Sequence, residues 1–122
     1  MTLCLWGVLA GCIAIGSLLP ANSPVLVGVG SMHVSDKVLH FCAYLALSFL
    51  PVLAIPDRRR GTAIGLSMIV LGGLLEIGQA FSPGRSPEIL DQLANTLGAI
   101  CGIVLARGCR YGPGVWRKRE AA

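Results

Sequence analysis

Charged residues are scarce in this chain, and they are unevenly spread. They make up 13% of the 122 residues, whereas a soluble domain contains about 25%. None occurs in residues 1–35, while hydrophobic residues reach 54% and the mean hydropathy is +0.73. This composition argues against a soluble globular domain and against a nucleic-acid-binding protein. It is typical of a single compact unit that crosses a membrane several times.

Familiar catalytic and metal-binding motifs are also missing. The sequence has no nucleophile elbow, no HExxH and no glycine-rich phosphate loop. Its cysteines are odd in number and scattered, without a CxxC or a Cys/His pairing at zinc-ligand spacing. They are Cys4, Cys12, Cys42, Cys101 and Cys109. Since four of them fall inside apolar segments, we interpret them as small packing residues.

Four apolar runs are long enough to approach the thickness of a bilayer. Each has roughly 18 to 21 residues, and a helix rising about 1.5 Å per residue needs about 20 of them to cross ~30 Å of hydrocarbon. The runs are Thr2 to Leu19, Asp36 to Ile55, Gly61 to Phe81, and Pro87 to about Ala106. We therefore predict an all-α fold, an integral membrane bundle of four transmembrane helices over residues 1–106. Residues 107–122 are expected to form a basic cytoplasmic tail.

The first run has two alternative interpretations, a signal peptide and a lipoprotein leader. It has no basic residues before its apolar part, and that part is longer than the apolar region of a typical signal peptide. Leu9-Ala10-Gly11-Cys12 resembles a lipoprotein box, but the apolar run continues past Cys12 to Leu19. We expect a retained transmembrane helix.

Basic residues predict how the chain is oriented. Eight lie in the 56–60 connection and the tail, at Arg58, Arg59, Arg60, Arg107, Arg110, Arg117, Lys118 and Arg119. The other side has only Lys37 and Arg85. Because basic residues concentrate on the cytoplasmic side of membrane proteins, both termini are expected there. Residues 20–35 and 82–87 are then expected to face outward.

Glycines spaced four apart occur in three of the runs. The pairs are Gly7 with Gly11, Gly61 with Gly65, and Gly98 with Gly102. Small residues at this spacing allow helices to approach closely in lipid. They favour a tightly packed bundle without indicating which faces meet.

Polar residues gather where the second run starts, the third ends and the fourth starts, which is one side of the membrane. Residues three or four apart share a helix face. The cluster consists of Asp36, Lys37, His40, Tyr44, Glu76, Gln79, Arg85, Glu88, Asp91, Gln92 and Asn95. An ionised side chain facing lipid costs about 2.5–3.5 kcal/mol on the mildest scale. We therefore expect these faces to meet, as ion pairs or around a wet cavity.

Some members of the cluster have simpler explanations. Ser35 before Asp36, and Ser86-Pro87-Glu88, look like helix starts, in which acids are favoured by the helix dipole. Tyr44 is explained by packing alone, and Asn95 by an interhelical hydrogen bond. Glu76 has no such local explanation.

These residues resemble the signature of the VanZ-like family. Ser35 to Tyr44 (SDKVLHFCAY) is similar to its DK-x-x-H-F-x-x-Y segment. Glu76-x-x-Gln79, Arg85-Ser86 and Asp91-x-x-Ala94-Asn95-x-x-Gly98 are similar to its E-x-x-Q, R-S and D-x-x-A-N-x-x-G elements. The resemblance covers about residues 35–102. It implies a small integral protein of the bacterial inner membrane, from a family whose name-giving member is associated with lowered susceptibility to the glycopeptide teicoplanin.

Three functions remain open at this point. The cluster binds a lipid headgroup, a lipid-linked precursor or a glycopeptide, with Lys37 and Arg85 for an anion and Glu76 and Asp91 for an amine. Alternatively it is the site of an enzyme acting on a lipid-linked precursor, with His40 as base and Glu76 or Asp91 as acid or orienting group. As a third possibility, the ion pairs of the cluster only stabilise the helix bundle and have no further function. We favour binding, and expect membrane lipids as partners, no nucleic acid and no cofactor. His40 and two carboxylates offer metal-ligand chemistry, but their spacing is not diagnostic and no metal is expected.

Overall fold

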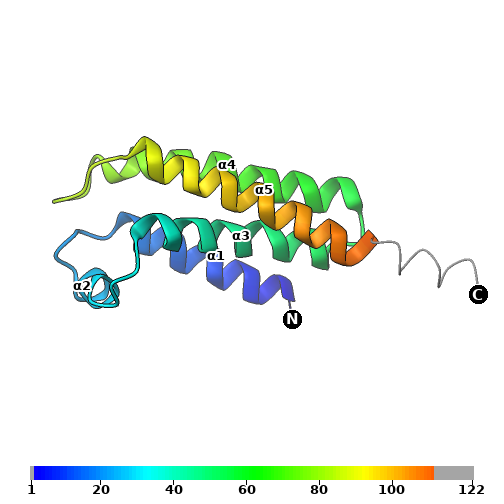
Figure 1. Cartoon of the computed structure of the whole chain (residues 1–122), viewed down its shortest axis with the longest axis horizontal. Coiled ribbons are helices and arrows are strands. Elements are labelled where there is room, and N and C mark those ends of the chain that lie inside the picture. Colours follow the sequence, from blue (N-terminus) through cyan, green and yellow to red (C-terminus); the bar gives the residue numbers. More distant parts are fainter. Residues whose placement is uncertain (1, 112–122) are drawn as a thin grey trace, which may run out of the picture.

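The computed structural model describes residues 2–111, and within that range it consists of helices joined by short connections (Figure 1). The helices are α1 (Thr2–Leu18), α2 (Pro24–Gly30), α3 (Asp36–Ala54), α4 (Arg58–Gln79) and α5 (Ile89–Tyr111). α3, α4 and α5 are long and apolar enough to cross a membrane, whereas α1 is apolar but has only 17 residues. The all-α prediction is confirmed for the described residues, and three of the four predicted spans correspond to helices long and apolar enough to cross a membrane. The expectation for residues 112–122 lies outside the described range.

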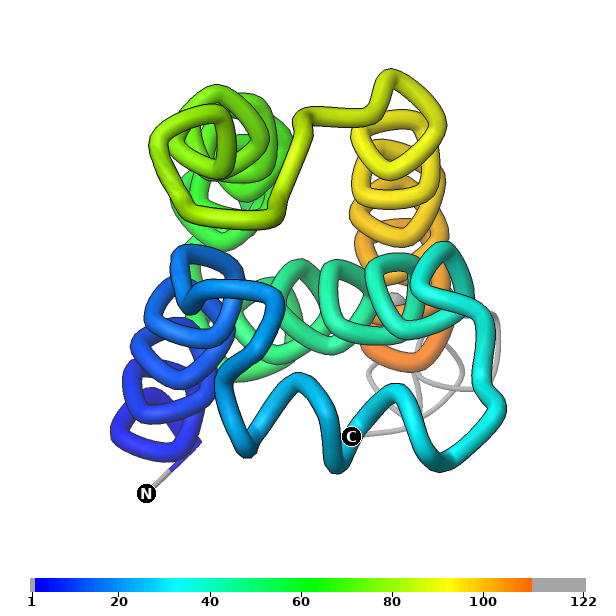
Figure 2. Tube along the Cα trace, turned by 90° about the vertical axis from the view of Figure 1, so that its left-hand side faces the viewer, coloured from blue at the N-terminus to red at the C-terminus, as the bar shows by residue number. Residues whose placement is uncertain are grey.

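α3 is the central helix of the bundle. It contacts α1, α4 and α5, while α2 lies across one end (Figures 1 and 2). α3 and α5 run in the same direction along the long axis, and α4 returns between them in sequence (Figure 1). The start of α3, the end of α4 and the start of α5 therefore lie at the same end of the bundle, as the sequence predicts.

The packing of α3 against α5 depends on two glycines. A Cβ atom added to Gly98 would overlap the carbonyl oxygen of Phe41, and one added to Gly102 would overlap that of Leu45. Only a hydrogen atom fits at either position, so the backbones of the two helices touch. This is the close approach that small residues four apart permit in membrane helices.

Gly61 and Gly65 bring α4 close to the second half of α3. A Cβ on Gly61 would lie 3.1 Å from the Pro51 carbonyl oxygen, and one on Gly65 would lie 3.3 Å from that of Ser48. The buried Ser48 hydroxyl also donates to the Gly65 carbonyl at 3.0 Å. The third predicted pair differs, because Gly7 and Gly11 have nothing within 4 Å. Two of the three glycine pairs therefore mark helix contacts.

α1 packs on the outside of α3 and α4. Its Trp6 indole N–H donates to the Leu47 carbonyl oxygen at 2.8 Å, and Leu9, Ala10 and Ile13 pack against a core of Tyr44, Leu47 and Met68. The opposite face of α1 exposes Leu5, Val8 and Ile15. Because this face is fully apolar, it is suited to contact lipid.

Several helix boundaries differ from the predicted ones. α4 begins at Arg58 instead of Gly61, because the Asp57 carboxylate accepts the Arg59 and Arg60 backbone N–H groups at 2.8 and 3.2 Å. α5 begins at Ile89, and the Glu88 carbonyl accepts from the Asp91 and Gln92 amides. The proline before it is therefore outside the helix. α2 is an additional helix, which begins after Ser23 as its N-cap with Pro24 in the first turn.

α5 also continues past the predicted end at Ala106, as far as Tyr111. Arg107 donates to the Thr62 hydroxyl at 2.9 Å. Arg110 donates to the carbonyl oxygens of Val52, Leu53 and Ile55. These oxygens belong to the last turn of α3 and its C-cap, where carbonyl groups have no partner within the helix. Arg107 and Arg110, which the sequence assigns to the tail, thus lie in α5. Their hydrogen bonds connect α5 to α4 and to the end of α3.

Gly98→Ala tests the contact between α3 and α5. The added methyl group must push the two backbones apart, so we expect a loss of about 1–3 kcal/mol in the free energy of unfolding. Thermal unfolding of the detergent-solubilised protein measures it. Gly11→Ala is the matched control, since it adds the same group to a helix where nothing lies within 4 Å. Equal melting temperatures for the two variants would contradict this packing.

Candidate functional site

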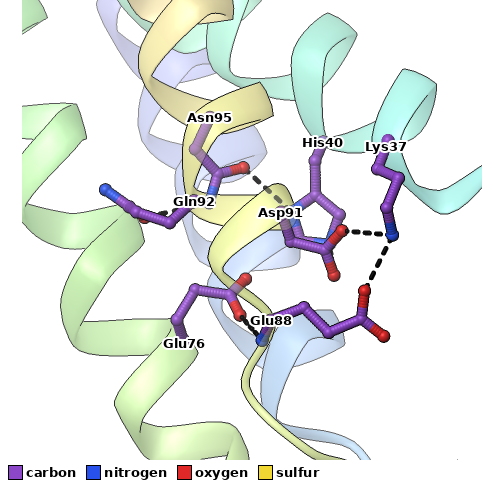
Figure 3. A network of polar contacts seen from close by, with 7 residues as sticks. All are labelled: Lys37, His40, Glu76, Glu88, Asp91, Gln92 and Asn95. Atoms are coloured by element: carbon purple, nitrogen blue, oxygen red, sulfur yellow. Dashed lines mark hydrogen bonds and ion pairs between the residues drawn. The ribbon is translucent and has the colours of Figure 1, made fainter.

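Polar side chains from α3, α4 and α5 meet at the end of the bundle that α2 crosses (Figure 3). Several are buried although they are charged or amide side chains: Glu76 is 5% exposed, Gln79 1%, Asp91 7% and Asn95 1%. Buried polar groups need partners, because desolvation without compensation is costly. The contacts among these side chains therefore determine what the site can do.

Lys37 joins the starts of α3 and α5. Its ammonium nitrogen lies 2.8 Å from Glu88 Oε2 and 3.0 Å from Asp91 Oδ1 (Figure 3). Asp91 is buried, whereas the other two side chains are partly open to solvent. The lysine thus pairs with the buried Asp91 carboxylate through Oδ1 and does not contact its other oxygen, Oδ2.

Glu76 is held by the backbone at the start of α5. Its Oε2 accepts the Glu88 backbone N–H at 3.2 Å (Figure 3). This amide precedes the first turn of α5, where N–H groups lack partners within the helix and favour negative charge. Within residues 2–111, Glu76 has no lysine or arginine as an ion-pair partner. Its buried carboxylate is therefore hydrogen-bonded, but no lysine or arginine of the described range balances its charge.

A chain of hydrogen bonds fixes the orientation of the His40 ring. The Gln92 amide nitrogen donates to the Ile69 backbone carbonyl at 3.2 Å, so the Gln92 oxygen must face away and accept from Asn95 Nδ2 at 3.4 Å. The Asn95 carbonyl oxygen then lies 2.9 Å from His40 Nδ1 (Figure 3). Because that oxygen can only accept, Nδ1 must carry a proton. The lone pair of a neutral His40 is therefore on Nε2.

His40 Nε2 faces the second oxygen of Asp91. The two atoms are 4.0 Å apart, which is longer than a hydrogen bond. Glu76 is close to both, since His40, Glu76 and Asp91 each offer a donor atom within 4.8 Å of the other two. Three helices thus bring an imidazole nitrogen and two carboxylates together.

Two adjoining cavities open beside this cluster. One, of about 300 Å³, is lined mainly by polar residues, with Gln79 and Glu88 among them. The other, of about 310 Å³, is largely apolar and runs between α1, α2 and α3 as far as His40 and Tyr44. Their linings share Leu26, Val29, Asp36, Arg85 and Asp91. The polar and apolar spaces therefore adjoin one another beside the cluster.

Arg85 and Gln79 have unused hydrogen-bonding capacity at the polar cavity. Arg85 lines both cavities, and its guanidinium makes no ion pair with any residue of the described range. The Gln79 amide nitrogen is buried and has no hydrogen-bond partner in that range. A buried donor without an acceptor is uncommon in folded proteins. Both groups are suited to meet an acceptor that enters the cavity.

The remaining predicted residues have different surroundings. Asp36 is exposed and lines both cavities. Tyr44 is buried in the core with Leu47 and Met68, and it also lines the apolar cavity. Ser35 is the N-cap of α3 as predicted, although its side chain makes no capping hydrogen bond.

Two members of the cluster make contacts that the sequence pattern did not predict. Gln92 orients Asn95, and the Glu88 side chain shares Lys37 with Asp91. The spacing of Gln92 three residues before Asn95 is a signal for the first of these contacts. Gly72 lies tightly against the same residues, because an added Cβ would lie 3.1 Å from atoms of Tyr44, Gln92 and Asn95.

The fold and the site define a class, an all-helical protein with membrane-length helices and a buried polar cluster at one end. The VanZ/LLP1 family model matches residues 10–110, and the chain belongs to that family. The predicted resemblance is thereby confirmed. Comparisons with curated proteins and with solved structures give no match.

Asn95→Ala tests the hydrogen-bond chain through the state of the His40 ring. In the wild type we expect ¹⁵N chemical shifts that place a proton on His40 Nδ1. Removing the Asn95 acceptor should produce a mixture of both tautomers, as expected for the exposed His33, which serves as an internal reference. An unchanged tautomer in Asn95→Ala would contradict the chain.

Proposed function

We propose that this protein spans the bacterial inner membrane and binds a lipid-linked ligand with an anionic headgroup in its outward-facing pocket. The observation that supports this function is that the two cavities share part of their lining. One is polar and one apolar, and Arg85 and Asp91 line both. A ligand with a charged group attached to a long hydrocarbon chain needs both environments side by side.

The polar cavity suits a phosphate-type group. Arginine binds phosphate and carboxylate oxygens through two parallel N–H groups, and such charge-assisted bonds are about twice as strong as neutral ones. Arg85 is available for this role because it makes no ion pair with the described residues. Gln79 offers a second buried donor at the same cavity.

The apolar cavity suits the hydrocarbon chain. Ile13 of α1, Val25 and Leu26 of α2, and Leu39 and Ala43 of α3 line it. α2 is entirely apolar apart from its glycines, and Val25 and Val27 are each 60% exposed. A short apolar helix lying across the end of the bundle is suited to the interfacial region of a bilayer. The ligand would then reach the pocket from the membrane.

The proposed topology has four spans, with both termini in the cytoplasm. α1 lies alongside α3 and is about 25 Å long at 1.5 Å per residue, slightly less than the ~30 Å hydrocarbon layer. Arg58 to Arg60 begin α4 at the end where Arg107 and Arg110 fasten α5, opposite the polar cluster. This concentration of positive charge supports placing that end in the cytoplasm.

Two further functions use the same site. A teicoplanin-type glycopeptide also combines a lipid chain with polar groups, so we propose it as an alternative ligand. An intramembrane acid/base enzyme acting on a lipid-linked precursor is the second candidate. It is favoured by His40, whose Nε2 carries the lone pair of the neutral ring and lies 4.0 Å from Asp91. A general base needs such an available lone pair.

Arg85→Gln tests the ligand. A polyprenyl phosphate is the probe, and the polyprenol of the same chain length is its uncharged counterpart. Loss of one charge-assisted contact, about 1.5–3 kcal/mol, should weaken binding of the phosphate roughly 10- to 100-fold. Binding of the alcohol should change little.

Arg59→Gln is the matched control, because it removes the same charge at the opposite end of α4. Equal affinity of wild type and Arg85→Gln for the phosphate would contradict the proposal. Teicoplanin is measured as a separate probe on the same variants. Mass spectrometry of the recovered lipid distinguishes binding from catalysis, since only an enzyme alters its substrate. A chemical change counts as catalysis by this site only if it is absent with the Asp91→Asn variant.

Reporter fusions test the topology. A reporter after Trp116 should be cytoplasmic and one inserted at Ser23 should be external. A third inserted at Pro56 should be cytoplasmic, as the control for the 56–60 connection. Inversion of all three would place the pocket in the cytoplasm, whereas Ser23 and Pro56 on the same side would show that α3 does not span. A cytoplasmic Pro56 and an external N-terminal tag would show that α1 does not span.

A further inference from the structure

We propose that His40, Glu76 and Asp91 form a binding site for one divalent transition-metal cation. The three residues come from α3, α4 and α5, and their donor atoms all lie within 4.8 Å of one another. This goes beyond the proposed ligand and does not depend on it. The sequence alone predicted no metal, because the ligands are distributed over three helices.

The His40 ring is oriented as in metal sites. A metal-bound histidine usually donates its other ring N–H to an oxygen, which fixes the tautomer and the direction of the coordinating lone pair. His40 Nδ1 donates to the Asn95 oxygen at 2.9 Å, and Nε2 faces Asp91 Oδ2 (Figure 3). The contacts of Asn95 with Gln92, and of Gln92 with the α4 backbone, hold the ring in this orientation.

The charge of the cluster also favours a cation. Glu76, Glu88 and Asp91 are three carboxylates, and Lys37 is the only lysine or arginine paired with them among residues 2–111. The lysine contacts Glu88 and Asp91 Oδ1, which leaves Glu76 and Asp91 Oδ2 without a lysine or arginine partner in the described range. Burying carboxylates without compensation is costly. A cation between these oxygens and His40 Nε2 would remove that cost.

A third observation is the unpaired amide nitrogen of Gln79. It is buried, it lacks a partner in the described range, and Gln79 lines the same polar cavity as Asp91. A metal with only three protein ligands keeps an open position, normally filled by water or by a ligand oxygen. Such an oxygen in the cavity is the acceptor that this amide lacks.

The donor set indicates the type of metal. One imidazole and two carboxylates suit zinc, manganese or iron, whereas magnesium and calcium prefer oxygen ligands alone. No cysteine belongs to the group, so thiolate-selecting metals are not favoured. With bonds of about 2.0–2.2 Å, ligand atoms lie roughly 3.3 Å apart in a tetrahedral site. Binding therefore requires the three donors to move closer together than they are here.

Metal content of the purified full-length protein is the direct test. After chelator treatment, Zn²⁺ and Mn²⁺ are added separately, and the desalted protein is analysed by mass spectrometry for metals. We expect about one ion per chain and a higher melting temperature with metal. Glu76→Gln and His40→Asn should each bind at least 100-fold more weakly. Cobalt substitution gives a second readout, because loss of the His40 ligand changes the visible absorption spectrum.

His33→Asn is the matched control, since it removes the other histidine of the chain, which is exposed and has a positive φ that asparagine tolerates. It should bind metal like the wild type. If Glu76→Gln does not fold, the metal affinity of His40→Asn alone tests the proposed site. A wild type that binds neither ion, or a His40→Asn protein with wild-type affinity, would overturn the proposal.

Discussion

The direct contact between the backbones of α3 and α5 determines the rest of the structure. At Gly98 and Gly102 the two parallel helices touch, and this sets their relative position along the axis. In that register Lys37 meets Asp91, His40 meets Asn95, and Arg110 reaches the end of α3. A shift by one turn, about 5.4 Å, would separate every one of these pairs. The site is thus a consequence of how two apolar helices pack.

The site also illustrates how a membrane-length helix accommodates a carboxylate. Glu76 faces neither lipid nor bulk water, because the start of α5 supplies a backbone N–H to it. The end of one helix is thereby covered by a side chain of its neighbour. Because Glu76 is only 5% exposed, this contact between helices replaces the solvation of its carboxylate.

Much of this arrangement follows from the sequence, since the length of the apolar runs predicts α3, α4 and α5 and their order predicts which ends meet. The charges of Glu76 and Asp91 predict that their faces turn inward, because facing lipid is unfavourable.

Other features depend on three-dimensional packing. The order of partners from Ile69 through Gln92 to His40 involves three helices, and no spacing along the chain encodes it. α2 was missed because seven apolar residues give too short a pattern, although Ser23-Pro24 is a helix-start signal. The two glycine pairs that form contacts could not be told from Gly7 and Gly11, because identical spacing carries no information about neighbours.

The hydrogen-bond chain that orients His40 ends on a main-chain oxygen of α4. A main-chain oxygen is present whatever residue occupies position 69, so the tautomer of the imidazole is insensitive to substitution there. The position of the Ile69 carbonyl in the α4 backbone therefore determines which ring nitrogen carries the proton. The side chains that connect this carbonyl to the ring are those of Gln92 and Asn95. Substitutions of the side chain at position 69 can therefore accumulate without disturbing the chemistry at the other end of this chain.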